Sequence, residues 1–178
     1  MGLFQQFRRN VISDQRSGWR ILLVCMGNIC RSPMAEGVLR QRAEEAGLAT
    51  VLHCDSAGTL AAHAGEAPDP RAQQVAGEKG LDISRLRARA VTPDDFQSFD
   101  WILAMDRNNL ATLLRQCPPQ YRIKVQLFLE FAGEGGEEVP DPYYGGIEGF
   151  QAVLARCERG AQGVIRRFQA QFPDDKPG

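Results

Sequence analysis

Short apolar runs alternate with stretches of helical periodicity from Trp19 to Phe172, and this alternation predicts an α/β fold. Four runs are short and bounded by turn residues, as buried strands are: residues 21–24, 50–54, 101–104 and 123–127. The predicted helices cover residues 33–46, 70–79, 93–99, 107–115 and 147–172. Strands separated by helices indicate one four-stranded parallel sheet with helices on both faces and right-handed crossovers.

Local signals mark several helix ends and one long loop. Gly47 and Gly80 follow the first two predicted helices, and Asp106 suits the N-cap of the fourth. In the last predicted helix, apolar residues recur three or four positions apart and predict one buried stripe: Ile147, Phe150, Leu154, Cys157, Ala161, Ile165 and Phe168. The preceding loop, residues 133–146, is rich in glycine and acid, and such long loops often carry function.

The length of 178 residues and the hydrophobic content of 43% indicate one globular domain with a substantial core. We expect this domain at residues 19–173, between an N-terminal extension at 1–18 and a C-terminal tail at 174–178. The extension contains one short amphipathic stretch. It is expected to be mobile, with docking onto a surface as the alternative.

The 21 basic and 22 acidic residues give a formal net charge of -1, which argues against nucleic acid or an anionic membrane as a partner. Any anion must therefore be bound locally. The five cysteines are odd in number and unevenly spaced, and no apolar segment is long enough for stable membrane insertion. These features predict a reducing, cytoplasmic location.

The sequence VCMGNICRSP at residues 24–33 connects the first predicted strand to the first predicted helix. Ser32 suits the N-cap position and Pro33 the first helical position. We therefore expect the loop to direct backbone N–H groups and the positive end of a helix dipole at one point. Phosphate-like anions bind at such points.

The side chains of this segment complete the predicted anion site. Gly27 permits tight curvature, Asn28 tolerates a left-handed conformation, and Arg31 offers a planar fork for two anion oxygens. The helix dipole, the N–H groups and Arg31 together favour a thiolate at Cys25. A thiolate beneath a bound phosphoryl group is a nucleophile in position for attack on phosphorus.

Four segments resemble those of the low-molecular-weight protein tyrosine phosphatase family, in its bacterial type. They are CMGNICRSP at 25–33, DSAGT at 55–59, FDWILAMDRNNL at 99–110 and VPDPYYGG at 139–146. The resemblance covers residues 19–172 and implies a flavodoxin-like fold of the phosphotyrosine phosphatase I type. It implies a phosphotyrosine protein as substrate, with a bacterial tyrosine kinase as one candidate, and inorganic phosphate as product. The phosphate-binding loop that it implies is Met26, Gly27, Asn28, Ile29, Cys30, Arg31 and Ser32.

The resemblance also implies a two-step reaction that needs no metal or cofactor. Cys25 forms a phosphocysteine while Arg31 and the loop N–H groups hold the phosphoryl oxygens. Asp141 protonates the leaving group and then activates water. Ser32 donates a hydrogen bond to the Cys25 sulfur and eases its departure.

Further supporting roles follow from the resemblance. Asn28 and Ser56 belong to the network that holds the loop shape, and Tyr143 and Tyr144 form one wall of the substrate cleft. The chain's two histidines lack a ligand partner at helical or hairpin spacing, so a zinc site is not expected.

Several residues have a simpler interpretation. The simpler interpretation of Ser32 is that it only caps a helix. The simpler interpretation of Asp141, which precedes a proline, is that it only forms a turn. Cys30 is either a small buried filler or, as in the family, the disulfide partner that shields Cys25 from irreversible oxidation. The remaining cysteines are expected to be packing residues: Cys54, Cys117 and Cys157.

Two positions depart from the family pattern. Relatives commonly carry an aromatic residue shortly after the DSAGT stretch, where this chain has Leu60, Ala61 and Ala62, so one wall of the cleft is in doubt. The family often has a histidine near Leu86, and residues 86–90 of this chain contain none, which puts a hydrogen bond to the loop in doubt.

Three other functions remain as alternatives. An arsenate reductase on this fold needs a resolving cysteine pair at about positions 80 to 100, where this chain has no cysteine. A phosphoarginine phosphatase has threonine where Ile29 stands, and an apolar Ile29 favours an aryl phosphate. A binding module without turnover needs neither Cys25 nor Asp141.

Overall fold

The computed structural model describes residues 18–173. Apart from Gly18, the predicted N-terminal extension lies outside the described residues, as does the predicted tail at 174–178. Within the described range, no helix has the length and apolar character needed to cross a membrane.

The centre of the fold is one four-stranded parallel sheet in the order β2-β1-β3-β4, which confirms the predicted architecture. The strands are β1 (Trp19–Cys25), β2 (Leu52–Gly58), β3 (Trp101–Ala104) and β4 (Val125–Leu127). The chain leaves β1 for β2 on one side and later returns to β3 on the other. Ligands of open parallel sheets bind at the carboxyl edge beside such a switch point, which here lies between β1 and β3.

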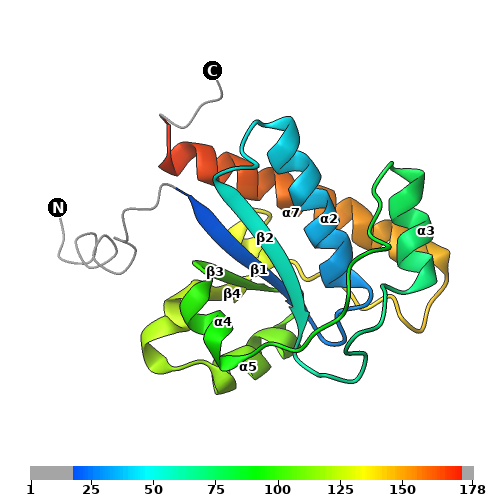
Figure 1. Cartoon of the computed structure of the whole chain (residues 1–178), viewed down its shortest axis with the longest axis horizontal. Coiled ribbons are helices and arrows are strands. Elements are labelled where there is room, and N and C mark those ends of the chain that lie inside the picture. The colour runs from blue at the N-terminus through cyan, green and yellow to red at the C-terminus, as the bar shows by residue number, and fades with distance from the viewer. Residues whose placement is uncertain (1–17, 174–178) are drawn as a thin grey trace.

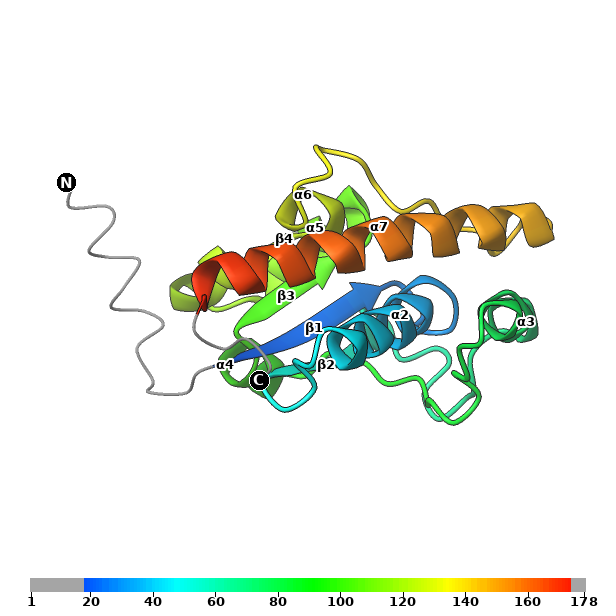
Figure 2. The same cartoon turned by 90° about the horizontal axis from the view of Figure 1, so that it is seen from above.

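Helices cover both faces of the sheet (Figures 1 and 2). They are α2 (Arg31–Glu45), α3 (Pro70–Glu78), α4 (Pro93–Ser98), α5 (Arg107–Gln116), the 3-10 helix η1 (Pro119–Lys124), α6 (Phe128–Phe131) and α7 (Ile147–Gln171). α2 and α7 lie side by side on one face, whereas α4 and α5 cover the other. α3 packs against both α2 and α7 beyond the carboxyl edge of the sheet.

β1 is buried on both faces, which explains its continuous apolar run. Ile21, Leu23 and Cys25 join the core beneath α2 and α7. Leu22 and Val24 join the second core, beneath α4 and α5. Since side chains alternate along a strand, this register sends Cys25 toward the face on which α2 begins.

α7 confirms the predicted stripe, because every member is buried except Ile147, which is half-buried. Two glycines bring the helix close to α6 and the residue after it. A Cβ at Gly163 would overlap the carbonyl oxygen of Ala132, and one at Gly160 would overlap the ring of Phe128. Glycine costs about 1 kcal/mol of helix propensity relative to alanine. The close packing explains why glycine stands at these two positions despite that cost.

The predicted start of the first helix was wrong. α2 begins at Arg31 with Cys30 as its N-cap, so Ser32 is not the cap and Pro33 is the third helical residue. The anion loop curls directly into the helix, and the Met34 N–H donates to the Cys30 carbonyl oxygen at 3.4 Å. The Ser32 hydroxyl is therefore available for the site.

Two strand bounds also differ from the prediction. The second strand was expected at 50–54 but β2 continues to Gly58, because its polar half pairs in register with the end of β1. The fourth strand is shorter than expected, since residues 119–124 form η1 after a proline pair. α6 was not predicted, because four residues show no periodicity.

Candidate active site

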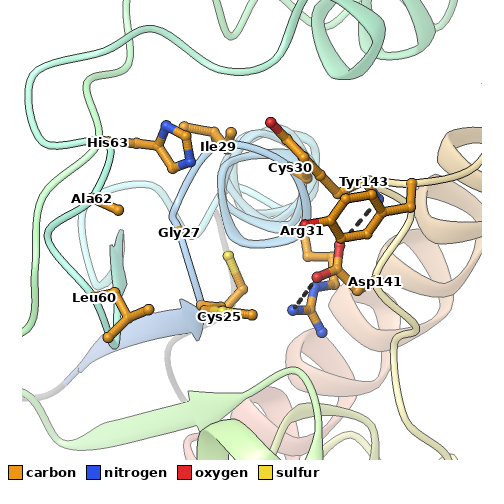
Figure 3. A pocket seen from close by; sticks show the side chains of 12 residues that line it. Cys25, Gly27, Ile29, Cys30, Arg31, Leu60, Ala62, His63, Asp141 and Tyr143 are labelled. Carbon is orange, nitrogen blue, oxygen red and sulfur yellow. Dashed lines mark hydrogen bonds and ion pairs between the residues drawn. The ribbon is translucent and has the colours of Figure 1, made fainter.

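The loop that leaves β1 has the conformation expected of an anion site (Figure 3). Asn28 adopts the left-handed region with φ of 57°, as its residue type predicted. Gly27 lies outside that region, so a left-handed conformation is not the reason for its glycine. A Cβ at Gly27 would lie 3.0 Å from Cδ2 of His63, so the absence of a side chain lets His63 pack over the loop.

The sulfur of Cys25 receives two contacts from the loop. The Asn28 N–H donates to Cys25 Sγ at 3.3 Å, and Ser32 Oγ lies 3.1 Å from the same sulfur. Asn28 Nδ2 donates to Ser32 Oγ at 2.8 Å, so the Ser32 hydroxyl hydrogen is left to donate elsewhere. The sulfur is the nearer of its two acceptors, since the Ala57 carbonyl oxygen lies at 3.4 Å.

A buried chain of hydrogen bonds supports Asn28 from behind. Asn28 Nδ2 also donates to Ser56 Oγ at 2.9 Å, and the Ser56 hydroxyl donates to Glu36 Oε2 at 2.5 Å. Asn28 Oδ1 accepts from the backbone N–H of Arg89 at 3.0 Å. The loop therefore receives a hydrogen bond from the segment at residues 86–90, although that segment contains no histidine.

Glu36 is the buried end of this chain and was missed in the sequence. Burial raises the pKa of its carboxyl, against the opposing effects of the Ser56 hydrogen bond and the Arg40 charge. Arg40, one turn further along α2, lies 2.5 Å from Glu36 Oε1. The i, i+4 spacing of an acid and an arginine on a helix is the signal that predicts such a pair.

Arg31 is buried at the centre of the site, with 2% of its side chain exposed. Its NH1 donates to Asp106 Oδ2 at 2.6 Å and to the Val139 carbonyl oxygen at 3.1 Å, and its NH2 lies 3.6 Å from Asp141 Oδ2. Burial alone would lower the pKa of Arg31, but the negative charges of Cys25, Asp106 and Asp141 raise it above its ordinary value. The guanidinium is therefore a fixed cation.

Asp106 was predicted only as a helix cap, and it has a second role. Its Oδ1 caps α5 by accepting from the Asn109 N–H at 2.7 Å, while its Oδ2 pairs with Arg31. Val24 pairs with Ala104 in the sheet, so the residues that follow β3 lie beside the loop that follows β1. An acid two residues after a central strand was the signal that the sequence offered.

Asp141 lies on the loop that runs from Val139 to α7, on the open side of Arg31 (Figure 3). Its Oδ1 accepts from the Tyr143 N–H at 3.1 Å, and 39% of its side chain is exposed. The turn that the Asp-Pro sequence predicted is therefore present. The turn holds the Asp141 carboxyl group at the pocket, so forming the turn and lining the pocket are compatible.

Cys30 lines the same pocket as Cys25. Burial raises the pKa of the Cys30 thiol to about 12, and the nearby charges of Asp69, Cys25 and Asp141 act in the same direction. Cys30 is therefore a thiol at neutral pH. The other three cysteines are buried in the two cores, as expected of packing residues: Cys54, Cys117 and Cys157.

The cleft above the loop has two different walls. One carries Tyr143 and Tyr144, whose rings meet edge to face at 5.0 Å. The other consists of Met26, Leu60, Ala62 and His63, so it combines aliphatic side chains with an imidazole. His63 was missed in the sequence; its Nδ1 lies 2.8 Å from Glu66 Oε2.

The arrangement gathers three groups of different chemistry in one pocket: the sulfur of Cys25, the guanidinium of Arg31 and the carboxyl of Asp141. Backbone N–H groups at the start of α2 point into the same loop. Such a site can bind a tetrahedral oxyanion, attack its central atom and exchange a proton with a departing group. The residues predicted from two distant segments therefore lie together.

The sequence matches the family described as low molecular weight phosphotyrosine protein phosphatase over residues 20–173. A protein of that description from Schizosaccharomyces pombe is 49% identical over 133 residues, covering 74% of this chain and 85% of that protein. A low molecular weight protein-tyrosine-phosphatase from Streptomyces coelicolor is 40% identical over 157 residues, covering 86% of this chain and 95% of that protein.

Solved structures share the architecture. A protein tyrosine phosphatase from Entamoeba histolytica, crystallised with Hepes in the active site, superposes with a TM-score of 0.82 at 38% identity, covering 87% of this chain and 99% of that one. Wzb from Vibrio vulnificus, in complex with benzylphosphonate, superposes with a TM-score of 0.73 at 29% identity, covering 83% of this chain and 97% of that one.

Proposed function

The chain belongs to the low molecular weight phosphotyrosine protein phosphatase family and is a protein-tyrosine-phosphatase, and from this premise we propose how it hydrolyses phosphotyrosine. The proposed route is a phosphocysteine intermediate, with Cys25 as nucleophile, Arg31 as phosphate clamp and Asp141 as general acid and base. The observation that carries the proposal is that these three side chains line one pocket.

In the first step the Cys25 sulfur attacks phosphorus opposite the leaving oxygen. The S–P bond forms as the bond from phosphorus to the aryl oxygen breaks, and the Asp141 proton passes to that oxygen. Arg31 and the loop N–H groups hold the three remaining oxygens as their charge redistributes. The buried Asp106 contact supports this role, because it fixes the guanidinium before substrate arrives.

In the second step Asp141 takes a proton from water, and the water oxygen attacks phosphorus. The S–P bond breaks, inorganic phosphate forms and Cys25 leaves as a thiolate. The Ser32 hydroxyl at 3.1 Å supports the departure of that thiolate by hydrogen bonding to the sulfur. No metal or cofactor takes part in either step.

The proposed substrate is a phosphotyrosine side chain on a protein, with a bacterial tyrosine kinase as one candidate partner. The two exposed tyrosines of the cleft wall offer an aromatic surface to the phenyl ring, and a benzyl group is what the Wzb complex carries on its phosphonate. All five cysteines are free thiols, which supports the proposed cytoplasmic location.

A substrate panel tests the proposal. We expect kcat/KM for a phosphotyrosine peptide to exceed that for a phosphoarginine peptide by about a hundredfold or more, because the pocket is built for an aryl group. Arsenate reduction with added thiols should stay at the level of a blank. Phosphate release is the readout for the two peptides and arsenite formation is the readout for arsenate, with Cys25→Ser as the control for contaminating phosphatase. Faster release from phosphoarginine would contradict the proposed substrate.

Mild peroxide should inactivate the enzyme reversibly. Burial keeps Cys30 a thiol at neutral pH, so peroxide should convert the sulfur of the proposed nucleophile, Cys25, to a sulfenic acid first. The Cys30 sulfur then attacks that sulfur, an S–S bond forms and water leaves. Mass spectrometry should find linked Cys25 and Cys30 peptides, and dithiothreitol should restore activity. The Cys30→Ser control should pass to irreversible sulfinic acid; sulfinic acid in the wild type without a linked peptide would rule the disulfide out.

A further inference from the structure

Arg71, near the start of α3, lies between the two loops that carry the proposed chemistry. Its NH1 donates to the Gly145 carbonyl oxygen at 3.1 Å, on the loop that carries Asp141. Its guanidinium also lies 5.7 Å from the ring centre of Tyr143 and 4.5 Å from that of Phe150. Arg71 does not line the substrate pocket, so these contacts serve the loop.

Asp69 fixes the guanidinium of Arg71 from the other side. The Nε donates to Asp69 Oδ1 at 3.0 Å and NH2 donates to Asp69 Oδ2 at 2.9 Å, which is a two-pronged pair. Hydrogen bonds from Arg71 lower the pKa of the Asp69 carboxyl. The Asp69 N–H donates to the Ile29 carbonyl oxygen at 2.7 Å, so the pair is anchored on the phosphate-binding loop.

The contacts continue from Arg71 to the carboxyl of Asp141. The ring of Tyr143 faces the Arg71 guanidinium, and the backbone N–H of Tyr143 donates to Asp141 Oδ1 at 3.1 Å. The Gly145 N–H donates to the Pro142 carbonyl oxygen at 3.0 Å, which closes the turn that Arg71 holds from outside. The opposite end of the loop is fixed separately, since Val139 is held by Arg31.

We propose that Arg71 is a positioning residue for Asp141, which it sets in place through the Tyr143–Gly145 turn while Asp69 ties it to the phosphate-binding loop. The proposal rests on the proposed function, because it assumes that Asp141 is the general acid. In this role, Arg71 and Asp69 keep a fixed distance between the loop that holds the phosphoryl group and the loop that delivers the proton. Displacement of a reacting group by about 1 Å can cost up to a hundredfold in rate.

The test is Arg71→Met, which keeps the length and apolar contact of the side chain and removes its donors and charge. We expect the single-turnover rate of phenol release to fall about ten- to thirtyfold for a phosphotyrosine peptide and less than about threefold for nitrophenyl phosphate, because the better leaving group needs less proton transfer. Arg71→Lys should lose most of the same activity, since an ammonium cannot form the two-pronged pair. The matched control is Arg42→Met, which breaks an exposed arginine–glutamate pair at the far end of α2 and should leave both rates unchanged.

A double-mutant cycle separates this proposal from the proposed function. If Arg71 acts through Asp141, Arg71→Met should have almost no further effect in an Asp141→Asn background. An undiminished Arg71 effect in that background, or equal losses for both leaving groups, would overturn the positioning role. If Asp141→Asn alone showed no leaving-group dependence, the general-acid assignment would fail instead. Loss of thermal stability without the leaving-group dependence would identify Arg71 as structural only.

Discussion

Cys25→Ser should abolish turnover and leave phosphate binding intact. The loop N–H groups, Arg31 and the helix dipole all remain, so the anion site should survive, whereas the proposed nucleophile is replaced by a hydroxyl that stays protonated. The loss of kcat should exceed about a thousandfold, since removal of such a residue usually costs at least that much. Burst and steady-state release of nitrophenol would measure it.

Binding is the second half of this prediction. Phosphate should raise the melting temperature of Cys25→Ser at least as much as that of the wild type, because the variant keeps the donors of the anion site. The matched variant is Arg31→Lys, which keeps the nucleophile and loses the planar fork. Unlike Cys25→Ser, it should bind phosphate weakly. Residual activity of Cys25→Ser above about one thousandth of the wild type would end the nucleophile assignment.

Asp141→Asn should slow phosphotyrosine hydrolysis by about two to four orders of magnitude, the usual contribution of general acid–base catalysis. Tyrosine has a pKa near 10, so its phenolate leaves poorly without a proton, whereas nitrophenol is far more acidic. The loss should therefore be smaller for nitrophenyl phosphate. The amide keeps the shape of the turn and can still accept the Tyr143 N–H that now reaches Oδ1.

Single-turnover release of each phenol is the measurement for Asp141→Asn. It isolates phosphocysteine formation from the later hydrolysis, in which Asp141 acts as a base. Glu148→Gln, which changes an exposed acid in the first turn of α7, is the charge-matched control and should leave both rates unchanged. Equal losses for both phenols would mean that the proton donor lies elsewhere and that Asp141 only forms a turn.

The sequence predicted what depends on neighbours along the chain. The sequence predicted the grouping of Cys25, Asn28 and Arg31 because a strand, a tight loop and a helix start place them within one segment. The left-handed conformation of Asn28 follows from its residue type. The parallel sheet was readable because each strand is a compact apolar run between helices. The error at Ser32 has the same origin, since a serine before a proline is a good cap unless a nearer partner takes its hydroxyl.

What the sequence did not reveal depends on pairs that are distant in the chain. Asp106 and Arg31 meet only because β1 and β3 are neighbours, and that order is not written in either segment. Glu36 reaches the loop through Ser56 on another strand, and Arg71 reaches Gly145 across the gap between α3 and α7. The hydrophobic pattern predicts which faces are buried, but it does not predict which polar groups meet at their edges.

The packing of α7 on α2 has a consequence for biosynthesis. Residues 147–171 are translated after every element that they contact, at roughly 5–20 residues per second. The nucleophile loop and α2 thus leave the ribosome well before their cover. Until α7 follows, the apolar side of α2 is open to chaperones, and the turn that carries Asp141 has no helix to end on. We therefore expect the nascent chain to lack phosphatase activity until α7 has emerged and docked.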